Sequence, residues 1–461
     1  MRTNNKAVYN GPTTHEGAIA AKATPLQQLR HTLLACLLWE DNFYEDGVSV
    51  AERIASLVSQ VETSDLVDLA VEARTRMKLR HVPLWLARCM AKDSKHRPAV
   101  GKLLPRIIQR PDELTEFLAL YWKNGKEPLA AQVKKGLAAA IGQFNEYNLA
   151  KYDRDAEVKL RDVLFLCHAK PKDAGARFTR LERKEVANGK YGRDLSDGEA
   201  LFARIVNRTL QTPDTWEVRL SAGEDKAASF RALMAEKTLG ALAFLRNLRT
   251  MQEAGIQIDE LRSYLAVLPV GRVLPFRFIA AARFAPHLEP ALEEAMFRCL
   301  QEHEKLAGVT HLLVDVSGSM DAPLSQKSDM RRLDAACGLA MLLRETGDVY
   351  VHTFSNALVS VPPRRGFALR DAIVQSQPHG GTALGGAVKA LIERVRGERL
   401  IVITDEQSAD VVPNPQAAFK RSYMLNVASY ENGVSAAGDW VRISGWSEAI
   451  VDYILALESA R

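Results

Sequence analysis

Five oxygen-bearing residues in the last third of the chain have types and spacing suited to binding a divalent cation. They are an aspartate and two serines in a D-x-S-x-S pattern, a threonine in the stretch HGGTALGG and an aspartate ending the run RLIVITD, namely Asp315, Ser317, Ser319, Thr382 and Asp405. Two carboxylates and three hydroxyls are hard donors, which favour Mg²⁺ with water molecules completing an octahedron. The glycines before the threonine let the backbone approach such an ion closely.

The segments that carry these residues are predicted to follow the strands of a parallel sheet. From residue 304 onward, apolar runs typical of strands alternate with helical patterns. The expected strands cover 311–315, 348–354, 399–405 and 423–428, and the expected helices cover 332–344, 385–396 and 447–458. This alternation indicates a doubly wound α/β domain, in which ligands bind beyond the carboxyl ends of the strands. We therefore expect the cation-binding segments to meet at one edge of the sheet.

The constellation resembles the metal-ion-dependent adhesion site of von Willebrand factor A domains, and all five residues match that motif. The resemblance implies that the hydroxyls bind Mg²⁺ directly and that one coordination position is left for an acidic ligand. The structural alternative is that Asp315 and Ser317 cap a helix and the glycine-rich stretch is a turn. Nothing nearby in the sequence supplies a nucleophile–base pair, so the expected site is not catalytic.

Residues before this domain show a helical pattern. Residues 1–25 suit an extended N-terminal arm, whereas apolar residues over 26–303 recur at spacings of three and four, as in Ile54, Leu57 and Val61. Prolines interrupt these runs at short intervals. We expect an α-solenoid of HEAT-like repeats over 26–303, followed by the α/β domain over 304–461.

Composition narrows the class of protein. The 461 residues are 47 % hydrophobic and 25 % charged, which is typical of a globular chain, and no apolar run is long enough for a membrane span. Five cysteines, odd in number and without a CxxC pair, favour reduced thiols in the cytoplasm. The net charge of +5 arises from residues 1–300, because residues 301–461 are slightly acidic. A basic front part permits a polyanionic partner such as RNA.

Several segments resemble the TROVE module of Ro ring proteins. They are FNEYNLAKY (144–152), LRDVLFLCHAKP (160–171) and KTLGALAFLRNL (237–248), with ITDEQSA from Ile403 and GWSEAIVDYI from Gly445 in the A domain. The order of the modules, TROVE and then an A domain, is that of Ro proteins. The chain is therefore identified as resembling a bacterial or phage member of this family.

The resemblance implies a fold, a function and partners. The helical repeats are expected to close into a ring, with the A domain helping to close it. Ro proteins bind small structured noncoding RNAs on the outer surface and thread single-stranded 3′ ends of misfolded RNAs, acting non-enzymatically in RNA quality control. Expected partners are these RNAs and an exoribonuclease or RNA-repair protein, with no DNA and no membrane. The expected state is a monomer.

Basic residues, with Tyr147 and Tyr152 interleaved, mark a candidate RNA surface between residues 134 and 177. The candidates are Lys134, Lys135, Lys151, Arg154, Arg161 and His168. Positive charge binds phosphates and aromatic rings stack on bases. Lys151 and His168 match family positions implicated in RNA binding, and a further basic family position falls at Arg154 or, by strict spacing, at Asp155. The alternatives are a solvated helix face for the lysines and a helix end for His168.

Two rival functions remain open. The first is a protein-binding adaptor, in which the A domain uses Mg²⁺ to capture an acidic residue of a partner. The second is an enzyme, which ranks last because the sequence contains no P-loop, HExxH or GxSxG motif. RNA binding should weaken with salt, whereas carboxylate capture should be abolished by a chelator.

Overall fold

The computed structural model divides the chain into two compact units. The residues that it describes are 24–35, 47–76, 79–153, 157–171, 196–211, 215–221, 225–271, 273, 275–301, 305–324, 330–428, 433–444 and 450–459. We call Arg53–Glu224 the helical unit, and Met1–Glu52 with Asp225–Arg461 the α/β unit. The predicted arm, except for its last two residues, lies outside the described residues. The predicted boundary at residue 304 falls within the α/β unit and stays a prediction.

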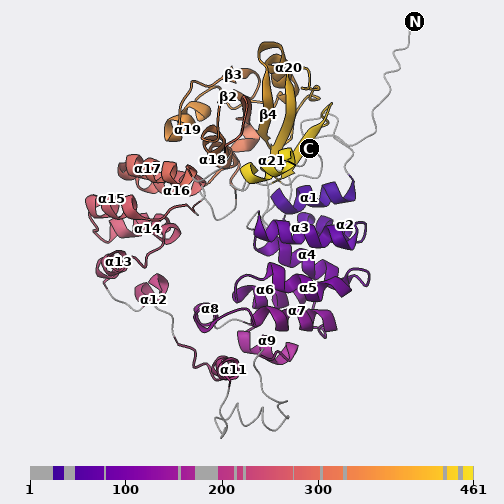
Figure 1. Cartoon of the computed structure of the whole chain (residues 1–461), viewed down its shortest axis with the longest axis vertical. Helices are drawn as coiled ribbons and strands as arrows, with labels where there is room; N and C mark the ends of the chain where they lie inside the picture. Colours follow the sequence, from indigo (N-terminus) through magenta and orange to yellow (C-terminus); the bar gives the residue numbers. More distant parts are fainter. Residues whose placement is uncertain are drawn as a thin grey trace. The chain divides into compact units, whose positions relative to one another are not determined.

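The helical unit is a stack of short helices, as predicted for HEAT-like repeats (Figure 1). Its helices are α3 (Thr63–Thr75), α4 (His81–Lys92), α5 (Arg97–Ile107), α6 (Asp112–Tyr121), α7 (Ala131–Ile141), α8 (Glu146–Tyr152), α9 (Leu160–Cys167), α11 (Asp197–Asn207) and α12 (Trp216–Ser221). Helix α2 (Gly47–Val58) contributes its last six residues. Among the described helices, none is long and apolar enough to cross a membrane.

Close packing of α5 on α7 shows how the sequence builds this stack. Leu103, Leu104 and Ile107 line the buried face of α5, and Val133 lies on the buried face of α7. Gly136 lets the two helices approach, because a Cβ atom there would lie 2.9 Å from the Leu104 Cδ1 atom. The apolar spacing of three and four therefore does place one face of each helix in the core.

The α/β unit combines further helices with a sheet. Its helices outside the sheet region are α1 (Pro25–Ala35), α13 (Lys226–Ala235), α14 (Ala241–Glu253), α15 (Ile258–Val267), α16 (Pro275–Phe284), the 3₁₀ helix η1 (Pro286–Leu288) and α17 (Glu289–Leu300). Helix α16 packs against α18 (Arg332–Arg344) beside the sheet. Gly338 of α18 permits this contact, since a Cβ atom there would lie 3.3 Å from the Cβ atom of Phe276.

The sheet has six strands in the order β3-β2-β1-β4-β5-β6. The strands are β1 (Thr310–Asp315), β2 (Val349–Phe354), β3 (Leu358–Ser360), β4 (Gly397–Thr404), β5 (Phe419–Asn426) and β6 (Trp440–Ser444), with α18, α19 (Gly366–Val374), α20 (Leu384–Arg394) and α21 (Ile450–Ser459). Only β3 is antiparallel to its neighbour. In this order β1 and β4 are the central strands. Core residues of β1, β2, β4 and β5 belong to one buried cluster with residues of α20. The predicted parallel α/β sheet is confirmed.

Two buried histidines join the neighbouring strands β1 and β2. Nδ1 of His311 lies 3.0 Å from Nε2 of His352, whose Nδ1 lies 3.1 Å from the Ser360 hydroxyl. Burial, together with the charges of His311 and Arg394, lowers the pKa of His352 from 6.5 to about 4. Burial also lowers the pKa of His311. The folded protein therefore holds this pair in its neutral form.

The histidine pair predicts acid sensitivity of the fold. Above pH 6.5, His352 is neutral in both the folded and the unfolded protein, so it does not change the free energy of unfolding. Between pH 6.5 and about 4 the unfolded chain binds a proton that the folded chain does not. This site should therefore lower the free energy of unfolding by about 2 kcal/mol at pH 5. Urea denaturation at pH 7.5 and pH 5 should show that difference reduced in His352→Gln, and an equal pH dependence in both proteins would contradict the assignment.

Candidate functional site

The predicted cation-binding residues lie at the carboxyl ends of the central strands. Asp315 ends β1, and Asp405 directly follows β4 beside it. Ser317 and Ser319 follow β1, where the 3₁₀ helix η2 (Gly318–Asp321) begins, and their hydroxyls lie 3.3 Å apart. Thr382 lies in the loop before α20. Backbone hydrogen bonds join the loop after β1 to the loop before α20, and that loop to the segment after β4, so the structure places the five residues, all buried, at one edge of the sheet.

Asp315 is fixed in orientation by its neighbours. Its Oδ1 accepts a hydrogen bond from the Ser317 amide at 2.9 Å, and its Oδ2 accepts one from the Thr404 hydroxyl at 2.7 Å. Burial and the nearby charge of Asp405 raise the pKa of Asp315 to about 7. Two carboxylates are thus held together in a dry site, an arrangement that a cation stabilises.

Asp405 presents one carboxylate oxygen that lacks a hydrogen-bond donor. Its Oδ1 accepts the Gln407 amide at 3.2 Å, whereas Oδ2 is buried and receives no hydrogen bond from any described residue. The guanidinium Nη1 of Arg332, itself buried, lies 3.6 Å from Oδ2. Burial raises the pKa of Asp405, while Arg332 favours the charged carboxylate. The arginine therefore supplies part of the positive charge that this oxygen needs.

The threonine loop is held against the other two segments by side chains that the sequence analysis did not single out. The Gly318 amide donates to the Gly380 carbonyl at 3.0 Å, which joins the D-x-S-x-S loop to the glycine-rich loop. The Ser408 hydroxyl has two acceptors within hydrogen-bond distance for its single proton, the Thr382 carbonyl at 3.1 Å and the Asp410 carboxylate at 2.8 Å. The Asp410 carboxylate in turn accepts hydrogen bonds from the amides of Gly385 and Gly386 in the first turn of α20. The sequence could have indicated these two residues, because Ser408 and Asp410 lie within five positions of the predicted ligand Asp405.

The residues present fit a Mg²⁺ ion. The carboxylates of Asp315 and Asp405 lie close to the serine hydroxyls, and backbone and side-chain hydrogen bonds from residues 408 and 409 hold the Thr382 carbonyl beside Asp405. One oxygen of Asp405 has no hydrogen-bond donor among the described residues. No group of three or more His, Cys, Asp or Glu residues suited to a metal occurs within the described ranges. The fit therefore rests on hydroxyls as much as on acids. Such an ion would supply an open coordination position for an oxygen ligand.

The predicted RNA-binding residues fall in the helical unit, on α7, α8 and α9. Lys134 and Lys135 lie in α7, Lys151 in α8 and Arg161 in α9, while His168 follows α9 and is exposed. Arg154 lies outside the described residues. The charge of Lys134 acts on the thiol of Cys167, whose pKa burial raises, so Lys134 is close to the end of α9.

The described structure shows few direct contacts among the predicted RNA-binding residues. Within the described residues, no hydrogen bond or ion pair joins Lys151 to α7 or α9, although its ammonium lies 5.9 Å from the ring of Tyr152. Arg110 also covers that ring, at 4.7 Å. Tyr147 is 49 % exposed and Phe165 of α9 is 51 % exposed. The aromatic side chains open to a base are therefore Tyr147, as expected, and Phe165, which the sequence analysis missed because it sits in an apolar helical run.

His168 has a left-handed backbone conformation with φ of 52°. Its amide bonds back to the carbonyls of Leu164 and Phe165, which ends α9. The helix-end alternative for His168 is thus present in the structure. Its exposed imidazole remains available for a ligand.

Comparisons with known proteins identify a family model and a solved structure that match this chain. The model of the TROVE domain matches residues 206–460. The crystal structure of the Deinococcus radiodurans RO (RSR) protein has the same fold, with a TM-score of 0.58, 18 % sequence identity and coverage of 93 % of this chain and 99 % of that chain. No curated protein sequence matches. The family model covers more than half of the residues, and the chain therefore belongs to the TROVE domain family.

Proposed function

We propose that this protein is an RNA-binding ring protein of the Ro type. It would bind small structured noncoding RNA and the single-stranded 3′ ends of misfolded RNA, and act non-enzymatically in RNA quality control. Membership of the TROVE family carries the proposal. The exposed rings of Tyr147 and Phe165, on the two helices that follow the lysine-bearing helix α7, support it, since stacking and charge are what single-stranded RNA requires. The proposal includes an exoribonuclease or RNA-repair protein as a binding partner and a location in the cytoplasm.

A titration with RNA across a salt series tests this function. One RNA carries a single-stranded 3′ tail and the other has the same duplex with blunt ends. We expect tail-dependent affinity that falls steeply with salt, because neutralised phosphates release counterions. Absence of binding at low salt would overturn the proposal.

Removal of the two exposed rings should weaken binding of the tailed RNA. Alanine at both Tyr147 and Phe165 should lower affinity by about tenfold or more, since a stacked base contributes about 1–3 kcal/mol. Filter binding or fluorescence anisotropy measures this loss. The matched control replaces two exposed apolar residues of the α/β unit, Leu242→Ala with Val267→Ala. Equal affinity of both double variants would show that the rings do not contact RNA.

A second candidate function is Mg²⁺-dependent capture of an acidic residue of a partner protein. The observation that favours it is the buried Oδ2 of Asp405, which has no hydrogen-bond donor within the described structure. We propose that Asp315, Ser317, Ser319, Thr382 and Asp405 hold Mg²⁺ there. Both functions can coexist, because RNA candidates and the cation site lie in different units.

Metal content should depend on both carboxylates. Asp315→Ala and Asp405→Asn should each weaken Mg²⁺ binding by more than about tenfold, as loss of a ligand or its support typically does. Equilibrium dialysis with metal analysis measures this, with the exposed Asp439→Asn as the charge-matched control. The backbone hydrogen bonds that join the loops do not involve the replaced carboxylates, so circular dichroism should show a folded protein. This should hold even though Asp315→Ala removes the acceptor of the Ser317 amide and the Thr404 hydroxyl. Parental Mg²⁺ content in Asp315→Ala would refute the site.

A further inference from the structure

We propose that Arg332 supplies a fixed positive charge at the candidate cation site, which weakens Mg²⁺ binding and makes an anion the preferred ligand of the bound ion. The inference rests on the second candidate function, because it concerns the same site. It adds a residue that determines both the affinity for the metal and the class of ligand at the open position. Arg332 is not one of the five predicted ligands and is the first residue of α18.

The backbone around Arg332 places its side chain at the site. The Arg332 amide donates to the carbonyl of Ala322 at 3.0 Å, and Ala322 directly follows η2, the short helix that contains Ser319. The guanidinium Nη1 atom donates to the Ser319 carbonyl at 3.4 Å. Arg332 is only 3 % exposed. Its charge is therefore held away from solvent, beside the loop that carries the two serine ligands.

Arg332 attracts Asp405 without occupying its free oxygen. The Nη1 atom lies 3.6 Å from Oδ2 of Asp405, which is beyond hydrogen-bond distance. That oxygen has no hydrogen-bond donor among the described residues. Its lone pairs therefore remain available to a metal ion, while the guanidinium contributes charge through space.

The charge of the site changes sign when the ion binds. Asp315 and Asp405 in their charged forms contribute two negative charges, and the buried guanidinium of Arg332 contributes one positive charge. A bound Mg²⁺ ion thus leaves one positive charge in excess, whereas the same site without Arg332 would be neutral. Because an uncompensated charge is costly in a buried site, this excess favours an anion over water at the open coordination position.

The neighbouring charged side chains are balanced by partners of their own. The Glu406 carboxylate forms an ion pair with Arg442 of β6. Asp334 of α18 forms one with Arg283 of α16. The carboxylate of Asp410 is partly exposed and accepts the first amides of α20, where the helix dipole is positive. The excess charge of the site therefore depends on the guanidinium that faces the metal ligands.

The affinity for Mg²⁺ is the first test. Arg332→Met removes the charge and keeps an apolar stem, whereas Arg332→Lys keeps the charge. Arg344→Met is the matched control, because it removes an arginine from the other end of the same helix, about 18 Å along the axis. Isothermal titration calorimetry of the full chain with magnesium chloride gives the dissociation constants.

We expect Arg332→Met to bind Mg²⁺ about tenfold more tightly, because a repulsive charge near the ion is removed. Arg332→Lys and Arg344→Met should stay close to the parent. Binding by Arg332→Met that is equal to or weaker than that of the parent would overturn the inference and leave the proposed cation site standing. Absence of Mg²⁺ binding by the parent itself would overturn both.

Thermal unfolding separates this role from a purely structural one. In EDTA, Arg332→Met should melt at a lower temperature than the parent, because two buried carboxylates lose a counter-charge. Saturating Mg²⁺ should raise its melting temperature by more than that of the parent, since tighter binding to the folded state stabilises it more. A deficit of equal size with and without Mg²⁺ would show that Arg332 only supports the fold, and would contradict the inference.

Acetate tests the preference for an anion. With each protein saturated with Mg²⁺, acetate is compared with chloride at equal ionic strength, and the melting temperature is recorded. The parent should be stabilised by acetate, and Arg332→Met should need about tenfold more acetate for the same rise. EDTA should abolish the effect, because the open position belongs to the ion. An equal response of the two proteins would show that Arg332 does not set the class of ligand.

Discussion

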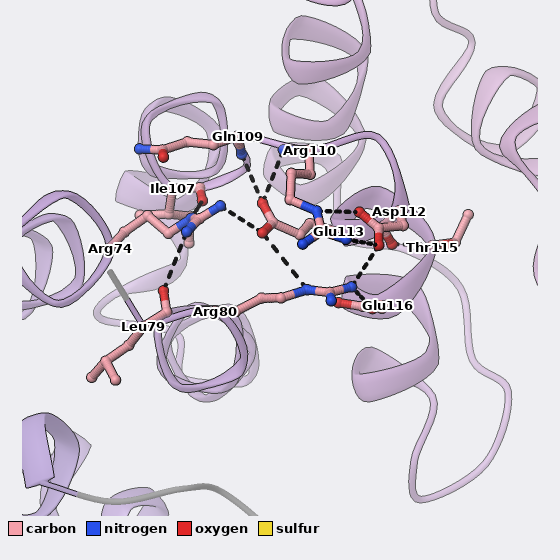
Figure 2. A network of polar contacts seen from close by, with 10 residues as sticks. All are labelled: Arg74, Leu79, Arg80, Ile107, Gln109, Arg110, Asp112, Glu113, Thr115 and Glu116. Atoms are coloured by element: carbon pink, nitrogen blue, oxygen red, sulfur yellow. Dashed lines mark hydrogen bonds and ion pairs between the residues drawn. The ribbon is translucent and has the colours of Figure 1, made fainter. Parts of the chain in front are cut away.

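Replacement of Glu113 by alanine should lower the free energy of unfolding of the helical unit by about 3–5 kcal/mol. Glu113 is fully buried at the start of α6. Its Oε1 accepts a hydrogen bond from Arg74 at 2.6 Å, and its Oε2 accepts the backbone amides of Gln109 and Arg110 at 2.7 and 3.1 Å (Figure 2). Without this carboxylate, a buried guanidinium and two amides lose their acceptor at once.

The glutamate one turn later provides the control. Glu116 pairs with Arg80, but burial raises the pKa of Glu116 to about 7. Its charged form is therefore barely favoured near neutral pH, and Glu116→Gln should change stability by less than about 1 kcal/mol. Urea denaturation, combined with hydrogen exchange of the amides of residues 107–113, separates the two variants. Equal losses in Glu113→Ala and Glu116→Gln would contradict the central role of Glu113.

The C-terminal helix should depend on an equally buried ion pair. Arg399 of β4 is 2 % exposed and donates to Glu458 of α21 through Nε at 2.6 Å and also through Nη2. The Tyr423 hydroxyl donates to the same carboxylate at 2.9 Å. Glu458→Ala leaves the arginine buried and unpaired, and should lower the free energy of unfolding by about 3–5 kcal/mol.

A double-mutant cycle measures this coupling. Arg399→Met combined with Glu458→Met removes both charges and keeps apolar volume, so the double variant should be more stable than Glu458→Ala. The pKa of Tyr423, which burial and Glu458 raise, should also fall in Glu458→Met. Additive losses in the cycle would show that the two side chains act independently.

The sequence was most informative where apolar runs end in an acid. Residues 311–315 and 399–405 were predicted as strands, and β1 and β4 lie there because central parallel strands are buried on both faces. The helix predicted over 332–344 has those bounds. Strands β3 and β6 and helix α19 were not predicted, since short elements at a sheet edge or with mixed exposure carry weak periodicity.

The sequence allowed the residues of the candidate cation site to be predicted, but not the side chains that contact them. The D-x-S-x-S motif named the residues at the ends of β1 and β4, whereas Arg332 could not be foreseen there, because a helix start seventeen residues after Asp315 meets the site only in the folded sheet. Closure of the helices into a ring stays a prediction.

The left-handed backbone of His168 sets which replacements this position tolerates. A side chain branched at Cβ is strained at a φ of 52°, whereas glycine adopts it freely and asparagine adopts it with little cost. Substitution by glycine or asparagine thus removes the imidazole and preserves the end of α9. Valine or isoleucine would unwind that end and move the chain beyond it. In a mutational scan of this position, the stability of each variant should depend first on whether its residue tolerates a positive φ and only then on the chemistry of its side chain.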